Sequence, residues 1–320
     1  MKVLIICREK PAFEHRMMPF VYEQAYALKE QGIETDFFLV SGLMPFAYFN
    51  HKRLNEKIRS FHPDIIHAHY GLSAIPALLS KKVPVVVTFH NGETLNWHIN
   101  LLTSLFSLKA DHVIYVAQHI RDLCYFKAKN YSILPCGVNL DEIEIIPYRQ
   151  ARRLLEFEDD KKYILFGGAF SNLRKNYPLL KEAIEKSGRD DIEVLEMKGL
   201  SRAECTLRMC ACDLFALPTK SEGSPQALKE AMACNCPIIA TDVADIRHLL
   251  GELDGHYICS FNPDEVANVL NCALSFNGRT EGRQRIIRLG LTNNQVAKQL
   301  IEIYKDLTNC CKITEQVSAK

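Results

Sequence analysis

The sequence lacks long apolar runs. No segment approaches the roughly eighteen consecutive apolar residues from which a membrane-spanning helix is recognised. At the N-terminus, MKVLIICREK has only a short apolar stretch before Arg8, Glu9 and Lys10, too short for the core of a signal peptide. These absences argue against a membrane-spanning or secreted chain and predict a cytoplasmic protein.

The sequence also has almost no net charge. Its 39 Lys and Arg residues stand against 38 Asp and Glu residues, and its basic clusters are short. Binding to nucleic acid normally needs an extended basic surface. Nucleic acid is therefore not an expected partner. With 320 residues, 48% of them hydrophobic, the chain can bury a large core and favours two domains over one.

The cysteine spacing typical of structural zinc is missing. The twelve cysteines stand mostly in apolar segments, as expected of small core residues in a reducing compartment, and we expect free thiols without bound metal. C-x2-C does not occur, and the closest groups have other spacings. These groups are Cys210/Cys212, Cys234/Cys236 and Cys310/Cys311.

Short apolar, β-branched runs alternate with longer segments of helical periodicity. This alternation predicts an α/β fold with parallel sheets, and the nearly continuous apolar character of the runs indicates strands covered on both faces. The alternation occurs twice. Strands are predicted near 3–7, 35–40, 64–68, 83–88, 112–117 and 131–135, and again near 163–168, 192–196, 213–217, 237–241 and 256–259.

The two series imply two doubly wound domains. The segment between them, PCGVNLDEIEIIPYRQ, carries Pro and Gly and is predicted to be a linker. We place the first domain at 1–145 and the second at 146–293. The last helical segment, near 294–310, either caps the second domain or packs back on the first.

The loops after the first strand of each series lack the common nucleotide-binding motifs. Neither CREKPAF nor GGAFSNLRKN contains G-x-G-x-x-G or the P-loop pattern. An ordinary NAD site or a P-loop is therefore not expected. Ligands of doubly wound sheets nevertheless bind at the carboxyl ends of the strands, so other loops there remain candidates.

The stretch SEGSPQALKEAM places two acids eight residues apart around a predicted helix start. Ser224 is the expected N-cap and Pro225 the first helical residue, which leaves Glu222 in the preceding loop. Glu230 would lie about 8 Å along the helix. Because helical side chains lean toward the N-terminus, its carboxylate can face the same side as Glu222.

The start of this helix is a candidate phosphate site. Unpaired N–H groups and the positive end of the helix dipole attract phosphate, so a nucleotide sugar would fit: Glu230 toward the ribose, Glu222 toward the hexose and the diphosphate between them. The alternative is that Glu222 only favours the dipole and Glu230 is a surface residue. The residues between the acids that would contact the donor are Gly223, Ser224, Pro225 and Gln226.

The segment EGSPQALKEAMACNCPIIATDVADI resembles the E-x7-E region of glycosyltransferase family 4. FHPDIIHAHYG, VPVVVTFHNGET, SILPCGVNLDEIEIIPYRQARRLL and LSRAECTLRMCACDLFALPT are similar to other parts of that family, in the same order. The resemblance covers nearly the whole chain. It implies the GT-B architecture of two Rossmann-like domains facing across a cleft, with the donor bound by the second domain.

The resemblance also implies a basic pair that holds the donor diphosphate. In AFSNLRKNYPLL, Lys175 matches the family lysine, and Asn176 stands where glycine is usual. The family arginine falls on Ala169 here. Arg174 is therefore the candidate for the second positive contact, unless the diphosphate is held more weakly than in the family.

One histidine matches a family residue beside the transferred sugar. His90, in TFHNGE, ends a predicted buried strand. His67 and His69 lie two apart and point to one side of their strand, but no third metal ligand is evident, so we interpret them as cleft-edge or packing residues. The family's glycine-rich first loop is replaced by REKPAFEHRMMPFVYEQ, so no acceptor residues are assigned.

We therefore expect a retaining glycosyltransferase, with Glu222, Lys175 and His90 as catalytic residues. Its donor would be a UDP or GDP sugar, which is a substrate and not a cofactor, and its acceptor a saccharide or lipid-linked hydroxyl in bacterial surface polysaccharide or glycolipid synthesis. D-x-D is absent, which favours metal-independent catalysis. Peripheral contact with the inner membrane face would involve MMPFVYEQAYALKEQ or NHKRLNEKIRSF. The alternatives are a nucleotide-sugar epimerase and a nucleotide-sugar-binding subunit without catalysis.

Overall fold

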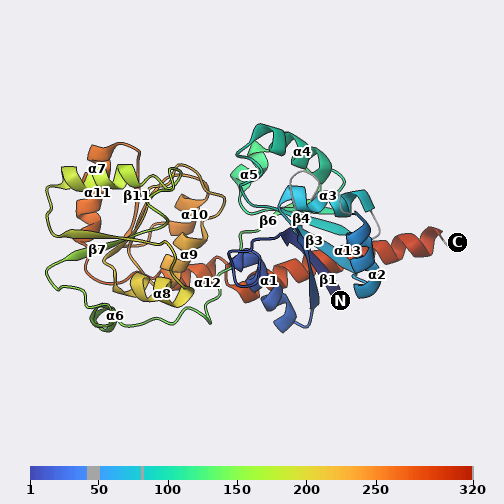
Figure 1. The fold of residues 1–320 in the computed structure, drawn as a ribbon, viewed down its shortest axis with the longest axis horizontal. Coiled ribbons are helices and arrows are strands. Elements are labelled where there is room, and N and C mark those ends of the chain that lie inside the picture. Colours follow the sequence, from blue (N-terminus) through green and yellow to red (C-terminus); the bar gives the residue numbers. More distant parts are fainter. Residues whose placement is uncertain (42–50, 81–82, 319–320) are drawn as a thin grey trace. The chain divides into compact units, whose positions relative to one another are not determined.

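The computed structural model describes residues 1–41, 51–80 and 83–318, and side chains up to residue 309. The chain divides into two compact units, 1–137 with 293–320, and 138–292 (Figure 1). Each unit is a parallel sheet with helices, and each strand range predicted from the sequence overlaps an observed strand.

The first unit has a sheet of order β2-β1-β3-β4-β5-β6 among the described residues. In strand β1, residues 2–8, the odd-numbered Val3 and Ile5 pack with helices α1, residues 19–30, and α13, residues 293–318, on one face of the sheet. Leu4 and Ile6 pack with α2 and α3 on the other. The strands are β1 Lys2–Arg8, β2 Glu34–Val40, β3 Ile65–His69, β4 Val85–Phe89, β5 His112–Tyr115 and β6 Tyr131–Ile133; the helices are α1 Pro19–Glu30, α2 His51–Phe61, α3 Gly71–Ser80, α4 Trp97–Ser107, α5 Gln118–Leu123 and α13 Asn293–Ser318.

The second unit has a sheet of order β11-β10-β9-β7-β8 within the described chain. Its strands are also buried on both faces, with Leu165 in one core and Ile164 in the other. The strands are β7 Lys162–Phe166, β8 Ile192–Glu196, β9 Leu214–Leu217, β10 Ile238–Thr241 and β11 His256–Cys259; the helices are α6 Tyr148–Leu154, α7 Tyr177–Ser187, α8 Arg202–Ala211, α9 Gln226–Ala233, α10 Ile246–Leu250, α11 Pro263–Leu274 and α12 Gly282–Arg288.

The C-terminal helix α13 belongs to the first unit. Val296, Leu300 and Tyr304 are buried in the same core as β1 and α1. The boundary between the units falls at Gly137, whereas the sequence placed it at residue 145. The intervening residues pack with the second unit, because Ile143 is buried in its core and Arg283 donates hydrogen bonds to the carbonyls of residues 140 and 143.

The cysteines with described side chains are free thiols, and most are buried. Cys210 and Cys234 lie in the hydrophobic core of the second unit that also contains Leu165. The side chains of Cys310 and Cys311 lie outside the described residues. No helix of the described chain is long and apolar enough to span a bilayer.

Candidate functional site

The loop after β7 brings the predicted basic pair to the carboxyl end of the second sheet. Its first residues, Gly167 and Gly168, are glycines because neighbouring groups leave no room for a side chain. A Cβ on Gly167 would lie 2.6 Å from the ring of Phe215, and one on Gly168 would lie 2.8 Å from Cγ of Lys175. The aliphatic part of Lys175 therefore lies directly against the backbone of this loop.

Lys175, Arg174 and Glu222 meet at one carboxylate. Lys175 Nζ lies 2.7 Å and Arg174 Nη1 lies 3.1 Å from Oε1 of Glu222. The Thr219 hydroxyl donates to the same oxygen at 3.0 Å. Glu222 is only 8% exposed, so the two cations compensate the charge of a largely dehydrated carboxylate.

This cluster lies where the order of the strands reverses. From β7 the chain runs to β8 on one side and then to β9 on the other, so the loops after β7 and β9 flank the switch point of the sheet. The carbonyl of Arg174 accepts a hydrogen bond from the Lys220 N–H at 2.9 Å, which joins the two loops. Ligands of open α/β sheets bind at such a position.

Replacing Gly168 with Ala is expected to displace the Lys175 side chain. The added methyl would occupy space 2.8 Å from its Cγ, a contact that must be relieved by moving the lysine stem. We expect weaker binding of a nucleoside diphosphate, by about tenfold, in isothermal titration calorimetry. Gly199→Ala is the control in the same unit, because a Cβ there meets nothing within 4 Å; its positive φ disfavours Ala, a strain that Gly168 does not have. Equal affinity in wild type and Gly168→Ala would contradict the close fit.

The start of α9 differs from the sequence prediction by one residue. Pro225, with ψ of 114°, is the N-cap, the helix begins at Gln226, and no side chain caps it. Ser224 therefore does not cap the helix. Its Oγ is buried without a hydrogen-bond partner in the structure. Gly223 is buried beside it. An uncapped helix end next to an unpaired hydroxyl can accommodate an anionic oxygen.

Glu230 belongs to a second ion-pair group. Its Oε1 lies 3.2 Å from Arg202 Nη1, and Arg202 also approaches Glu142 at 3.4 Å. Burial raises the pKa of Glu230, against the opposing effect of Arg202. Sequence reasoning missed Arg202, which is the first residue of α8 after the N-cap Ser201.

In the first unit, His90 lies after β4 in a group of rings. Its Nε2 is 3.1 Å from Nδ1 of His69 at the end of β3, and the rings of Phe20 and Tyr70 pack against it. His90 is only 8% exposed. Burial lowers the pKa of His69 to about 3, so this imidazole is neutral at pH 7.

The backbone at His90 is held by a buried acid that sequence reasoning did not identify. Glu93 accepts hydrogen bonds from the N–H groups of Gly71 at 3.0 Å and His90 at 3.3 Å. Burial raises the pKa of Glu93 to about 7, although these hydrogen bonds act in the opposite direction. The acid thus fixes the loop that carries His90.

His67 packs in the core and has both ring nitrogens engaged. Its Nδ1 lies 2.6 Å from the Tyr304 hydroxyl and its Nε2 lies 2.7 Å from the Thr88 hydroxyl. Across the described residues, no three His, Cys, Asp or Glu side chains are grouped as a metal site would require.

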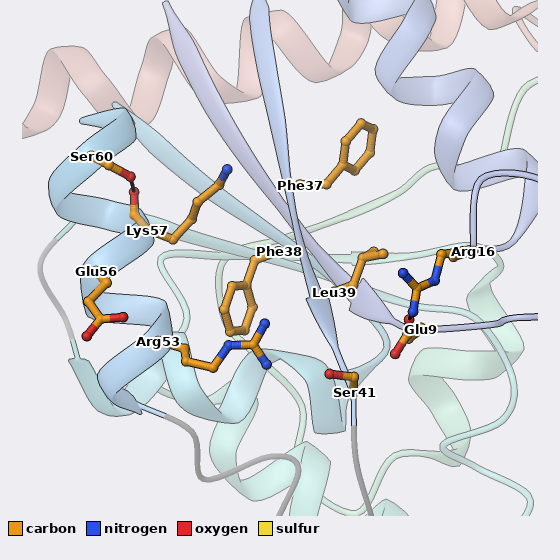
Figure 2. A pocket seen from close by; sticks show the side chains of 10 residues that line it. All are labelled: Glu9, Arg16, Phe37, Phe38, Leu39, Ser41, Arg53, Glu56, Lys57 and Ser60. Carbon is orange, nitrogen blue, oxygen red and sulfur yellow. Dashed lines mark hydrogen bonds and ion pairs between the residues drawn. The ribbon is translucent and has the colours of Figure 1, made fainter.

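A separate hollow of about 610 Å³ opens beside β2 and α2 of the first unit (Figure 2). Two of the cations at its wall are already paired, Arg16 with Glu9 and Lys57 with Asp36. It lies at the edge of the sheet, whereas His90 follows β4 in the interior. It is therefore distinct from the group around His90. Its lining residues are Glu9, Arg16, Phe37, Phe38, Leu39, Ser41, Arg53, Glu56, Lys57 and Ser60.

Two family models match the chain, one in each half. Residues 3–142 match Glycosyltransferase Family 4, and residues 153–275 match Glycosyl transferases group 1. The glycosyltransferase TuaC of Bacillus subtilis, named for teichuronic acid biosynthesis, is 26% identical over 61% of this chain and 57% of its own length. The glycosyltransferase MJ1178 of Methanocaldococcus jannaschii is 25% identical over 60% of this chain and 59% of its own. The alignments thus span less than three fifths of either relative.

Solved structures resemble the chain over nearly its full length. Sucrose-phosphate synthase from Thermosynechococcus elongatus has a TM-score of 0.82 at 17% identity, covering 97% of this chain and 99% of its own. Anabaena Alr3699/HepE, in complex with UDP-glucose, has a TM-score of 0.76 at 15% identity, covering 96% of this chain and 100% of its own. At these identities the likeness establishes the fold, which is GT-B as the sequence predicted.

Proposed function

We propose that the chain is a glycosyltransferase that transfers a sugar, with retention of configuration, from a nucleoside diphosphate donor to an acceptor hydroxyl. The match of each unit to a glycosyltransferase family model and the GT-B fold support this proposal. The observation that carries this proposal is the meeting of Lys175 and Arg174 on Glu222 at the switch point of the second sheet. The name of TuaC and the UDP-glucose held by HepE support a UDP sugar and a bacterial surface polysaccharide.

The cluster suits a donor that carries its own negative charge. The carboxylate of Glu222 pairs with both cations and offsets one of their two positive charges. A bound diphosphate would attract Lys175 and Arg174, which leaves Glu222 able to accept a hydrogen bond from the sugar. The cations would then stabilise the charge that develops on the departing diphosphate.

The remaining predicted residues have consistent places in this proposal. The uncapped start of α9 and the unpaired Ser224 hydroxyl suit a phosphate oxygen. Glu230, oriented by Arg202, suits the ribose hydroxyls. His90, fixed by Glu93 and paired with His69, suits hydrogen bonding to a sugar hydroxyl.

A thermal-shift panel of nucleotide sugars and NAD tests the donor class. Because a ligand that binds only the folded state raises its stability, by about 2.7 kcal/mol at a hundred times Kd, UDP or GDP sugars should raise Tm. Stabilisation by NAD alone would contradict the proposal. Incubation of the stabilising sugar without acceptor distinguishes an epimerase, which would convert it to an isomer.

Glu230→Ala is expected to remove the preference for ribose. The variant loses the carboxylate that would accept the ribose hydroxyls, so UDP should bind about tenfold more weakly, while 2′,3′-dideoxy-UDP should bind as it does to wild type. Calorimetric titration of both nucleotides measures this difference. Glu185→Ala, an exposed acid in the same unit, is the control. If Glu230→Ala still bound UDP more tightly than 2′,3′-dideoxy-UDP, as wild type is expected to do, the ribose hydroxyls would be bound by another residue.

A further inference from the structure

Helix α4 of the first unit has its polar and apolar faces reversed. The residues that it buries against the protein are Asn100, Thr103, Ser104 and Ser107. A surface helix normally buries its apolar stripe and exposes its polar residues. Here the outward residues are apolar and between 41% and 59% exposed; they are Leu95 before the helix, Trp97, Leu101, Leu102 and Leu105 within it, and Leu108 after it.

The polar inner face fixes this orientation. Asn100 donates from Nδ2 to the carbonyl of Leu123 at 2.9 Å and accepts from the N–H of Tyr125. Ser104 accepts from the N–H of Phe126. Rotating α4 to bury its leucines would break these bonds and leave the amide of Asn100 unpaired.

Close packing against α3 adds a second constraint. A Cβ on Gly71, at the start of α3, would lie 2.6 Å from Cβ of Thr103, so the inner face of α4 admits only small side chains there. The leucines could not be accommodated at this contact. The apolar outer face is thus built into the packing of the unit.

The last residue of α5 and the segment after it enlarge the apolar surface. The hydrogen bonds to α4 hold Leu123, Tyr125 and Phe126 next to it, and all three side chains are exposed. Figure 1 shows α4 and α5 together in this unit. We call the exposed apolar residues of both segments the α4 surface; its members are Leu95, Trp97, Leu101, Leu102, Leu105, Leu108, Leu123, Tyr125 and Phe126.

The charges around the α4 surface are mainly positive. Helix α4 contains no Asp, Glu, Lys or Arg. Lys109 follows it, and Lys127 and Lys129 follow Phe126, all of them exposed. The nearby acids are fewer than these lysines; Asp111 accepts a hydrogen bond from the N–H of Val85, and Asp122 accepts one from the side chain of Gln118. An apolar surface bordered by lysines complements an anionic, partly apolar partner.

We propose that the α4 surface docks on a lipid bilayer that contains anionic lipids. Leucines would enter the boundary of the acyl chains, Trp97 and Tyr125 would lie at the headgroup level, and the lysines would contact lipid phosphates. The segments singled out in the sequence for this role do not offer such a face. The α1 residues Val21 and Leu28 and the α2 residue Leu54 are buried in the core.

Trp97 is the only tryptophan of the chain and reports directly on docking. With vesicles of phosphatidylcholine and phosphatidylglycerol, we expect a blue shift of its emission and co-sedimentation of the full-length protein. High salt and vesicles of phosphatidylcholine alone should weaken both. The double variant Leu101→Glu/Leu105→Glu should reduce the bound fraction about tenfold, since it removes apolar contact and adds negative charge.

Leu154→Glu is the matched control, because Leu154 is exposed on α6 of the second unit. Unchanged thermal unfolding would show that the double variant folds, and unchanged stabilisation by UDP would separate docking from the donor site. Equal vesicle binding by wild type and the double variant would overturn the proposal, as would no binding by wild type. The proposal would also be overturned if the wild-type protein did not bind vesicles but self-associated, and if Leu101→Glu/Leu105→Glu abolished that self-association. The α4 surface would then join two copies of the chain.

Discussion

Replacing Glu222 with Gln is expected to lower the rate of sugar transfer about 10²–10³-fold, the effect typical of losing one preorganised electrostatic group in an active site. Glu222 lies within hydrogen-bond distance of Lys175, Arg174 and Thr219, so the amide keeps the shape of the side chain and removes its charge. Release of nucleoside diphosphate from the donor identified by thermal shift measures the rate of transfer when an acceptor is present, and the rate of hydrolysis, with water as the acceptor, when none is added.

The same variant should bind UDP at least as tightly as wild type. Removing the carboxylate leaves Lys175 and Arg174 without the charge that competes with the diphosphate. A rate that falls while affinity is kept is what a catalytic role requires. Glu185→Gln, on the exposed face of α7, controls for the loss of one acid. Full turnover by Glu222→Gln would refute the role of Glu222, and donor binding without turnover by wild type would favour a binding subunit.

Replacing Lys175 with Met is expected to weaken nucleoside diphosphate binding roughly ten- to hundredfold, because a hydrogen bond to a charged group contributes about 1.5–3 kcal/mol. Lys175 is only 13% exposed, and Met can follow the same path past Gly168. Arg174→Met should have a smaller effect, since Arg174 is 36% exposed and more of its charge is screened by water. Calorimetric titration with UDP measures both.

Lys181→Met controls for the loss of one positive charge, because Lys181 lies on the exposed side of α7. Its affinity for UDP should match that of wild type. If Arg174→Met were the more damaging variant, Arg174 would be the main diphosphate ligand, and our assignment of Lys175 would be wrong. If neither change affected affinity, the donor would bind elsewhere.

The sequence predicted the fold well because the strands are buried on both faces. Continuous apolar runs such as VLIIC and VPVVVT mark such strands independently of their partners. The proximity of Lys175 and Glu222 also follows from the sequence pattern. Both residues come after strands of one parallel sheet, and the carboxyl ends of parallel strands share one edge of the sheet. The cap at Ser224 was misplaced because Pro225 can occupy either the N-cap or the first helical position.

Other features depend on long-range contacts that local patterns do not encode. Arg202 meets Glu230 from a different helix, and Tyr304 reaches His67 across 237 positions of the chain. The α4 surface was missed for a different reason. Apolar residues at helical spacing identify one face of a helix, but they do not reveal whether that face is turned toward the core or away from it.

The return of α13 to the first unit has a consequence for synthesis. Residues 138–292 form their unit from one continuous segment, whereas the first unit needs residues from both ends of the chain. On the ribosome, the second unit therefore emerges complete before Leu300 and Tyr304 are available to fill the core beneath β1. The unit whose first residues are made earliest is therefore the last to have all of its residues available.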